Sequence, residues 1–175
     1  MDEPTRQAKQ PVTVLAGPYG HPVHPILVTV PIGAWVASLV FDVASHLVSP
    51  GGFLAQGSVW LIALGGIGAL AAASVGFLDL FAIPPRTPAF RTGLVHMGLN
   101  LAVTAGYAAG FAWRLSEPGR EAGPVPAGQI VLSAVCLAVL AVSGYLGGKL
   151  AFRYGVRVAD EHTQAEGFGT ARTTG

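Results

Sequence analysis

The chain has 175 residues, of which 51% are hydrophobic and only 11% are charged. Soluble domains carry about 25% charged residues, so this composition excludes a water-facing surface over most of the chain and predicts a membrane protein. The net charge of +1 gives no electrostatic basis for binding nucleic acid.

Four apolar stretches follow an N-terminal segment at 1–20, and each is long enough to cross a bilayer, which takes about 20 residues. We expect transmembrane helices at about 25–48, 58–83, 92–114 and 127–151. Short loops rich in proline and glycine separate them, so sequential helices should be antiparallel neighbours. The expected fold is an all-α, four-helix membrane bundle over residues 21–157, followed by a disordered cytoplasmic tail at 158–175.

The distribution of Lys and Arg predicts the orientation of the bundle. An even number of spans puts both termini on one side of the membrane. Eight basic residues fall on that side and two on the other: Arg6, Lys9, Arg86, Arg91, Lys149, Arg153, Arg157 and Arg172 against Arg114 and Arg120. Because cytoplasmic loops carry the excess of basic residues, we expect cytoplasmic termini and a place in the plasma membrane.

Two carboxylates, Asp42 and Asp79, fall within the expected spans. Each costs roughly 2.5 to 3.5 kcal/mol at a helix centre on insertion scales, so both must face protein, water or a ligand. Counting along the helices divides the polar residues into two layers. The cytoplasmic layer contains His24, Asp79, His96, Asn100, Lys149 and Arg153, and the outer layer contains Asp42 and His46. We expect structural roles for Asp42, His46 and Lys149.

Prolines fix the geometry around the first histidines, which form the segment HPVHP at 21–25. Pro25 suits the first turn of a helix and leaves His24 near the N-cap. Pro31 removes a backbone hydrogen bond further on and should kink the first helix.

A faint repeat pairs a histidine with an aromatic residue eleven positions later: His24 with Trp35, and His96 with Tyr107. The segments GFL at 76–78 and GYL at 144–146 also correspond. These matches suggest two helical hairpins related by a pseudo-twofold axis along the membrane normal. Small residues four apart predict packing faces on three helices. They are Gly68, Ala72 and Gly76, then Gly98, Ala102, Gly106 and Gly110, and finally Gly144 and Gly148.

Several segments together resemble a known family. They are HPVHPILVTVPIGAWVASLVFD, the GFLD segment ending at Asp79, His96 with Asn100, and SGYLGGKLAFRYGVRV. The resemblance covers residues 19–158 and is to the bacterial four-helix membrane proteins catalogued as domain of unknown function 2231. Some members carry a Rieske-type iron–sulfur domain, so the resemblance implies a redox partner of that kind. This chain has a single cysteine and no such domain.

Our leading functional hypothesis is a b-type haem-binding or redox-associated subunit. His24 and His96 would supply axial ligands from two helices at similar depth. Asn100 lies one turn from His96, and Arg153, with Lys149, Arg86 or Arg91, would pair with the haem propionates.

Two alternatives stay open. One is a site for a divalent metal or small solute formed by His24, Asp79 and His96, with Asn100 supporting the ligands. The other is a structural or scaffolding membrane subunit in which Asp79 pairs with Lys149 or Arg153. The sequence contains no motif of a soluble enzyme, so an enzymatic role is disfavoured.

Overall fold

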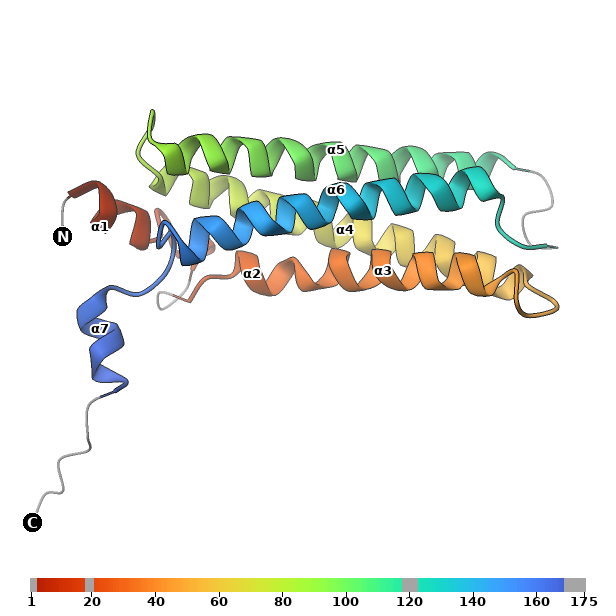
Figure 1. The fold of residues 1–175 in the computed structure, drawn as a ribbon, viewed down its shortest axis with the longest axis horizontal. Helices are drawn as coiled ribbons and strands as arrows, with labels where there is room; N and C mark the ends of the chain where they lie inside the picture. Colours follow the sequence, from red (N-terminus) through yellow and green to blue (C-terminus); the bar gives the residue numbers. More distant parts are fainter. Residues whose placement is uncertain (1–2, 18–20, 118–122, 169–175) are drawn as a thin grey trace, which may run out of the picture.

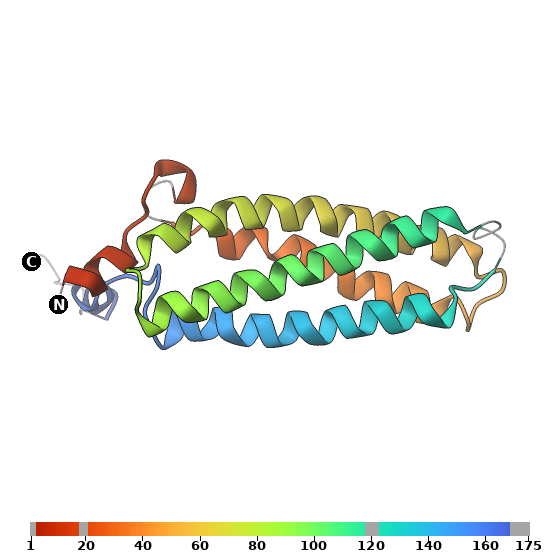
Figure 2. The ribbon, with the colours of Figure 1, turned by 90° about the horizontal axis from the view of Figure 1, so that it is seen from above.

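The computed structural model describes residues 3–17, 21–117 and 123–168. These residues form helices and no strand, and four helical spans lie side by side as a bundle (Figures 1 and 2). The first span consists of α2 (His24–Leu27) and α3 (Thr29–Ala44), and the others are α4 (Gly52–Ala82), α5 (Pro88–Ser116) and α6 (Ala127–Phe152). The expected all-α membrane bundle is therefore confirmed.

The local sequence explains where the long helices begin. Thr87 caps α5, because its Oγ1 accepts a hydrogen bond from the backbone N–H of Phe90 at 3.1 Å. Pro88 then occupies the first turn, where a missing N–H costs nothing. Helix α4 starts at Gly52, earlier than the expected start near 58, because the buried Leu54 and Ala55 extend the packed surface.

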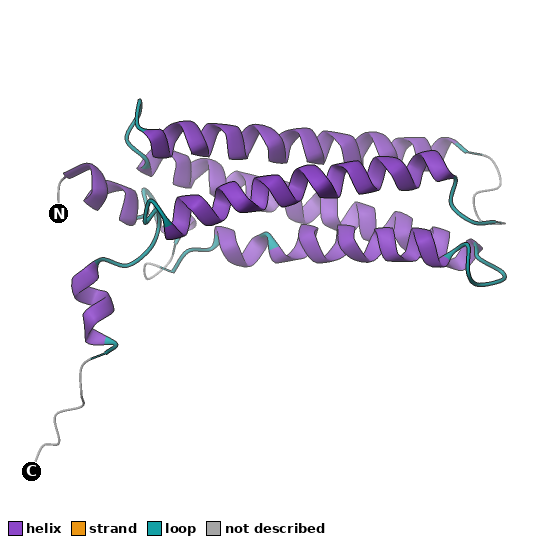
Figure 3. Cartoon of the chain, viewed as in Figure 1, coloured by secondary structure: helices purple, strands orange, loops and turns teal. Residues whose placement is uncertain are grey.

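Pro31 breaks the first span. Because Pro31 has no N–H, the carbonyl of Leu27, four residues earlier, loses its helical donor. The helix is interrupted at Val28, between α2 and α3, and Figure 3 shows a short loop there. The kink expected from the sequence is thus a one-residue break. This break determines how α2, which begins with His24, is oriented relative to α3.

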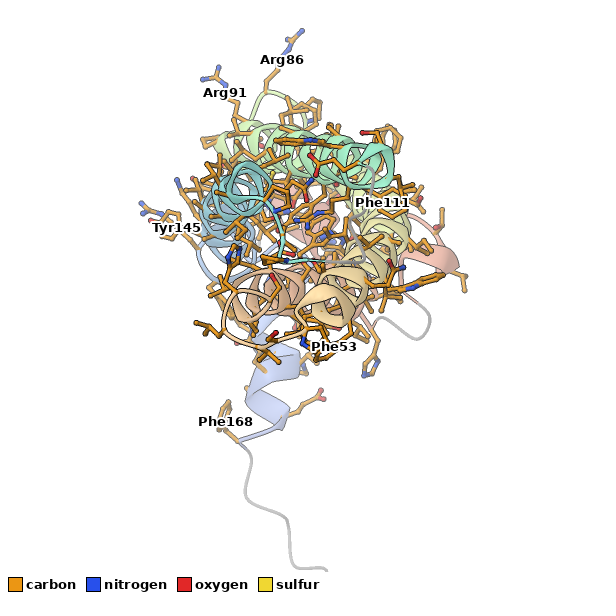
Figure 4. All side chains as sticks on the ribbon, turned by 90° about the vertical axis from the view of Figure 1, so that its right-hand side faces the viewer. Phe53, Arg86, Arg91, Phe111, Tyr145 and Phe168 are labelled. Carbon is orange, nitrogen blue, oxygen red and sulfur yellow. The ribbon has the colours of Figure 1, made fainter. Side chains whose placement is uncertain are left out.

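The core is a narrow column between the helices, and most of each span faces outward. Its buried residues are Trp35, Ile62, Ala69, Val103, Tyr107 and Cys136. Only 17–28% of the most apolar window of each span is buried. Side chains such as Trp60 and Phe53 are 70% and 63% exposed, and Figure 4 shows Phe53 at the rim of the bundle seen end-on. Such an apolar outer surface suits contact with lipid.

The described segments nearest the two termini, residues 3–17 and 153–168, lie at the same end of the bundle (Figure 1). The N-terminal segment contains α1 (Glu3–Lys9) and the short helix η1 (Val14–Ala16). The tail, expected to be disordered from 158 onward, contains α7 (Glu161–Glu166), whose N-cap is Asp160. Residues 169–175 lie outside the described part of the chain.

Candidate functional site

His24 and His96 meet inside the bundle, at the end that carries the termini. Their ring centroids are 6.4 Å apart and their planes are at 85°. His24 opens α2, and His96 lies about two turns into α5. The structure thus brings together two imidazoles that the sequence placed at similar depth.

Each imidazole is held by a backbone carbonyl of the following membrane span. Nδ1 of His24 lies 2.8 Å from the carbonyl oxygen of Ala72 on α4, and Nδ1 of His96 lies 2.8 Å from that of Ser143 on α6. A carbonyl can only accept, so each Nδ1 carries the proton and donates it. In the neutral rings Nε2 then keeps its lone pair. This is the state in which a histidine binds a metal, with its other nitrogen oriented by a hydrogen bond.

A glycine makes room for each ring. A Cβ atom on Gly76 would lie 2.8 Å from Cε1 of His24, and one on Gly147 would lie 3.1 Å from Cε1 of His96. Each glycine follows the carbonyl that accepts the imidazole proton by one helical turn. The two hairpins therefore use the same device to seat a histidine.

Asn100 supports the seat of His96. Its Nδ2 donates to the carbonyl oxygen of His96 at 2.9 Å and to Oγ of Ser143 at 2.8 Å. These bonds use both protons of the amide, so the longer contact of 3.2 Å to Nε2 of His96 does not consume that lone pair. Oγ of Ser143 lies 3.0 Å from Nδ1 of His96. Asn100 thus fixes the carbonyl and hydroxyl groups around the ring.

The partner of Asp79 is Arg157, so the expected pairing with Lys149 or Arg153 is wrong. Nε of Arg157 lies 3.0 Å from Oδ1 of Asp79, and the side chains are 7% and 13% exposed. Lys149 instead places its ammonium 5.6 Å from the centroid of the Tyr154 ring, and Arg153 is exposed.

A sharp turn after α6 brings Arg157 back to the bundle. Gly155 and Arg157 both have positive φ angles, of 67° and 59°. The backbone N–H of Arg157 donates to the carbonyl of Ala8 at 3.0 Å, and Nη2 donates to the carbonyl of Ala16 at 3.2 Å. Arg157, from the segment after α6, thereby contacts both α4 and the N-terminal segment.

The outer layer is organised by an ion pair that the sequence did not suggest. Arg114 of α5 binds both carboxylate oxygens of Asp42, with Nη2–Oδ2 at 2.7 Å and Nη1–Oδ1 at 3.0 Å. The two side chains are 3% and 0% exposed, and Nη2 also donates to Oγ of Ser133 at 3.2 Å. The other expected member of this layer, His46, hydrogen-bonds through Nε2 to the carbonyl of Val125 at 2.8 Å.

An aromatic pair separates the two polar layers. Trp35 of α3 and Tyr107 of α5 stack with centroids 4.2 Å apart and an angle of 8° between the rings. Each also donates to a carbonyl of the neighbouring helix in its own hairpin, Trp35 to Ile62 at 3.3 Å and Tyr107 to Ser133 at 3.4 Å.

The three pairs reveal the symmetry of the chain. The partners are 72 positions apart in every case: His24 and His96, Trp35 and Tyr107, Asp42 and Arg114. Equivalent residues that contact each other lie on a twofold axis, so the two hairpins are related by a pseudo-twofold axis along the bundle. The sequence correspondence of Gly76 with Gly144 is wrong by three positions, because the glycine that seats the second histidine is Gly147.

The expected metal triad does not assemble as a group of ligands. Within residues 3–17, 21–117 and 123–168, no three side chains of His, Cys, Asp or Glu lie close enough to hold one metal ion. The site centres instead on the two imidazole rings of His24 and His96, and Asp79 is paired with Arg157.

Residues 20–160 match the family described as "Predicted membrane protein (DUF2231)". The chain belongs to this family. Neither a curated protein nor a solved structure matches this chain. The match includes all four spans, and each of the polar and aromatic pairs described above lies within it. In this member of the family, therefore, the paired residues belong to the family's own domain and not to an added segment.

Proposed function

We propose that this membrane protein binds one b-type haem, with Nε2 of His24 and Nε2 of His96 as the axial ligands. The observation that carries the proposal is the meeting of two anchored imidazoles whose Nδ1 protons are both donated to carbonyls. Such anchoring leaves the lone pair of each Nε2 in the state that binds a metal.

The spacing of the rings supports iron ligation. An iron atom bound by two imidazoles lies about 2.0 Å from each nitrogen, which puts the ring centroids about 6 Å apart. The observed separation is 6.4 Å. The separation of the two rings therefore suits one iron between them.

The basic residue best placed for a haem propionate is Arg157. It is nearly buried beside Asp79, whereas Arg153 is exposed, and Arg86 and Arg91 project away from the bundle in Figure 4. On this proposal the propionate and Asp79 share the guanidinium, which offers five donors.

We further propose that the termini are cytoplasmic and that the haem exchanges electrons with a separate redox protein. Arg114 is buried in an ion pair and is not a loop charge. Removing it from the count increases the excess of basic residues at the end that carries the termini. A Rieske-type iron–sulfur protein is the partner that the family resemblance favours.

The second candidate function is structural. It is favoured by the internal contacts of the polar side chains, since Asp42 and Asp79 both pair with arginines of the chain and both histidines bond to carbonyls. A scaffolding subunit needs only a stable bundle and no bound ligand. A divalent-metal site is a weaker candidate, because no third His, Cys, Asp or Glu joins the two histidines within the described part of the chain.

An absorption spectrum of the purified protein, expressed with excess haem, separates these functions. We expect one haem per chain and a low-spin spectrum, which His24→Ala and His96→Ala should each abolish. His46→Ala is the matched control and should leave the spectrum intact. A colourless protein that binds no haem on titration supports the structural function, and a colourless protein that retains a metal supports the metal site.

A further inference from the structure

A shallow groove runs along α6 near the end of the bundle that carries the termini. It is lined by Tyr145, Gly148, Lys149, Phe152 and Arg153. Tyr145 and Phe152 are 73% and 92% exposed, and Figure 4 shows Tyr145 projecting from the bundle. The groove is therefore on the outer surface, and its lining comes from one helix.

This side of α6 faces away from the helical neighbours. A Cβ on Gly144 would meet nothing within 4 Å, and one on Gly148 would meet only Phe152 at 3.9 Å. The glycine that packs is Gly147, against His96. The packing face expected at Gly144 and Gly148 is thus on the wrong side of α6. Because α6 is a membrane span, these glycines leave a depression in a surface that meets lipid.

The end of the groove is positively charged. Lys149 and Arg153 are one helical turn apart and therefore lie on one face. Within the described residues neither has a carboxylate oxygen within 4.0 Å. The aromatic rings of Tyr145 and Phe152 flank these cations, and aromatic side chains favour the level of the lipid headgroups.

We propose that this groove binds one acidic phospholipid. Lys149 and Arg153 bind the phosphate, which arginine and lysine recognise as charged donors. The upper part of one acyl chain lies over Gly148 and Gly144, between the two aromatic rings. Basic pockets on the surface of membrane helices bind acidic headgroups in this way. The two cations contact the phosphate and the two glycines contact the acyl chain, so a single helix provides both contacts of the lipid.

Native mass spectrometry of the full-length protein in a non-ionic detergent tests the proposal, with phosphatidylglycerol and phosphatidylcholine as probes. We expect one phosphatidylglycerol bound in preference to phosphatidylcholine. The double substitution Lys149→Gln with Arg153→Gln should weaken phosphatidylglycerol about tenfold or more. The matched control, Arg86→Gln with Arg91→Gln, removes the same charge at the same end of the bundle and should keep the preference.

A second variant tests the groove separately from its charge. Gly148→Leu keeps both cations and fills the depression at an outward position, so the fold should persist while phosphatidylglycerol binding weakens. Inorganic phosphate should compete poorly, because it has no acyl chain. Equal losses in the two double variants, full binding by Gly148→Leu, equal binding of the two lipids, or a dimer that buries this face would each overturn the proposal.

Discussion

Asp42 and Arg114 lie 72 positions apart in the chain and close a bidentate ion pair in the bundle interior, where neither side chain is more than 3% exposed. A buried pair of this kind is costly to break, because the remaining charge loses its partner in a medium that solvates it poorly.

Asp42→Ala should therefore lower stability by about 3–5 kcal/mol, as measured by unfolding of the purified protein in detergent. Because the two positions are related by the pseudo-twofold axis, exchanging the residues as Asp42→Arg with Arg114→Asp should recover part of the loss. Ser133 limits that recovery, because it accepts a hydrogen bond from Arg114 and would not be placed to accept one from an arginine at position 42. If the exchanged protein is no more stable than Asp42→Ala, the symmetry does not extend to this pair.

The second prediction concerns Asp79 and its cation. Asp79→Ala should destabilise the protein by about 1–3 kcal/mol, since it leaves the guanidinium of Arg157 nearly buried and unpaired. A double-mutant cycle with Arg157→Ala should give a coupling energy well above the error, whereas the matched cycle with Lys149→Ala should be additive. Coupling to Lys149 in place of Arg157 would contradict the observed pairing.

The third prediction concerns the glycines that seat the histidines. Gly76→Ala and Gly147→Ala should each destabilise the protein by about 1–3 kcal/mol, because the new methyl group displaces an imidazole that lies 2.8 or 3.1 Å from it. Gly144→Ala is the control, since nothing lies within 4 Å of its Cβ position. Thermal unfolding of the three variants in one detergent gives the comparison. Equal stability of all three would mean that the rings shift without cost.

The fourth prediction is the topology. A reporter that is active only outside the cytoplasm should be silent when fused after Gly175 and active when inserted in the loop between α5 and α6. The basic residues at the end that carries the termini are the physical reason. The reverse pattern would place the histidine pair at the outer face.

The sequence predicted the number of spans and the depth of His24 and His96, because hydropathy and helical rise determine both. It could not identify Arg114 as a buried residue, because a basic residue at the end of an apolar stretch is assigned to the adjoining loop. Arg157 lies beyond α6, where helical periodicity no longer applies and only the backbone turn at 155–157 decides what the side chain meets. In Gly147-Gly148, adjacent identical residues give no sign of which one faces the bundle.

The ion pair across the axis also bears on how such a chain could arise. A hairpin that crosses the membrane twice starts and finishes on the same side, so two copies joined end to end keep one orientation without any change of flanking charge. Two unaltered copies, however, would bring identical residues together at the positions of Asp42 and Arg114, and like charges there would repel. The present pair therefore requires two halves that differ at these positions. It also disfavours assembly of either half with itself.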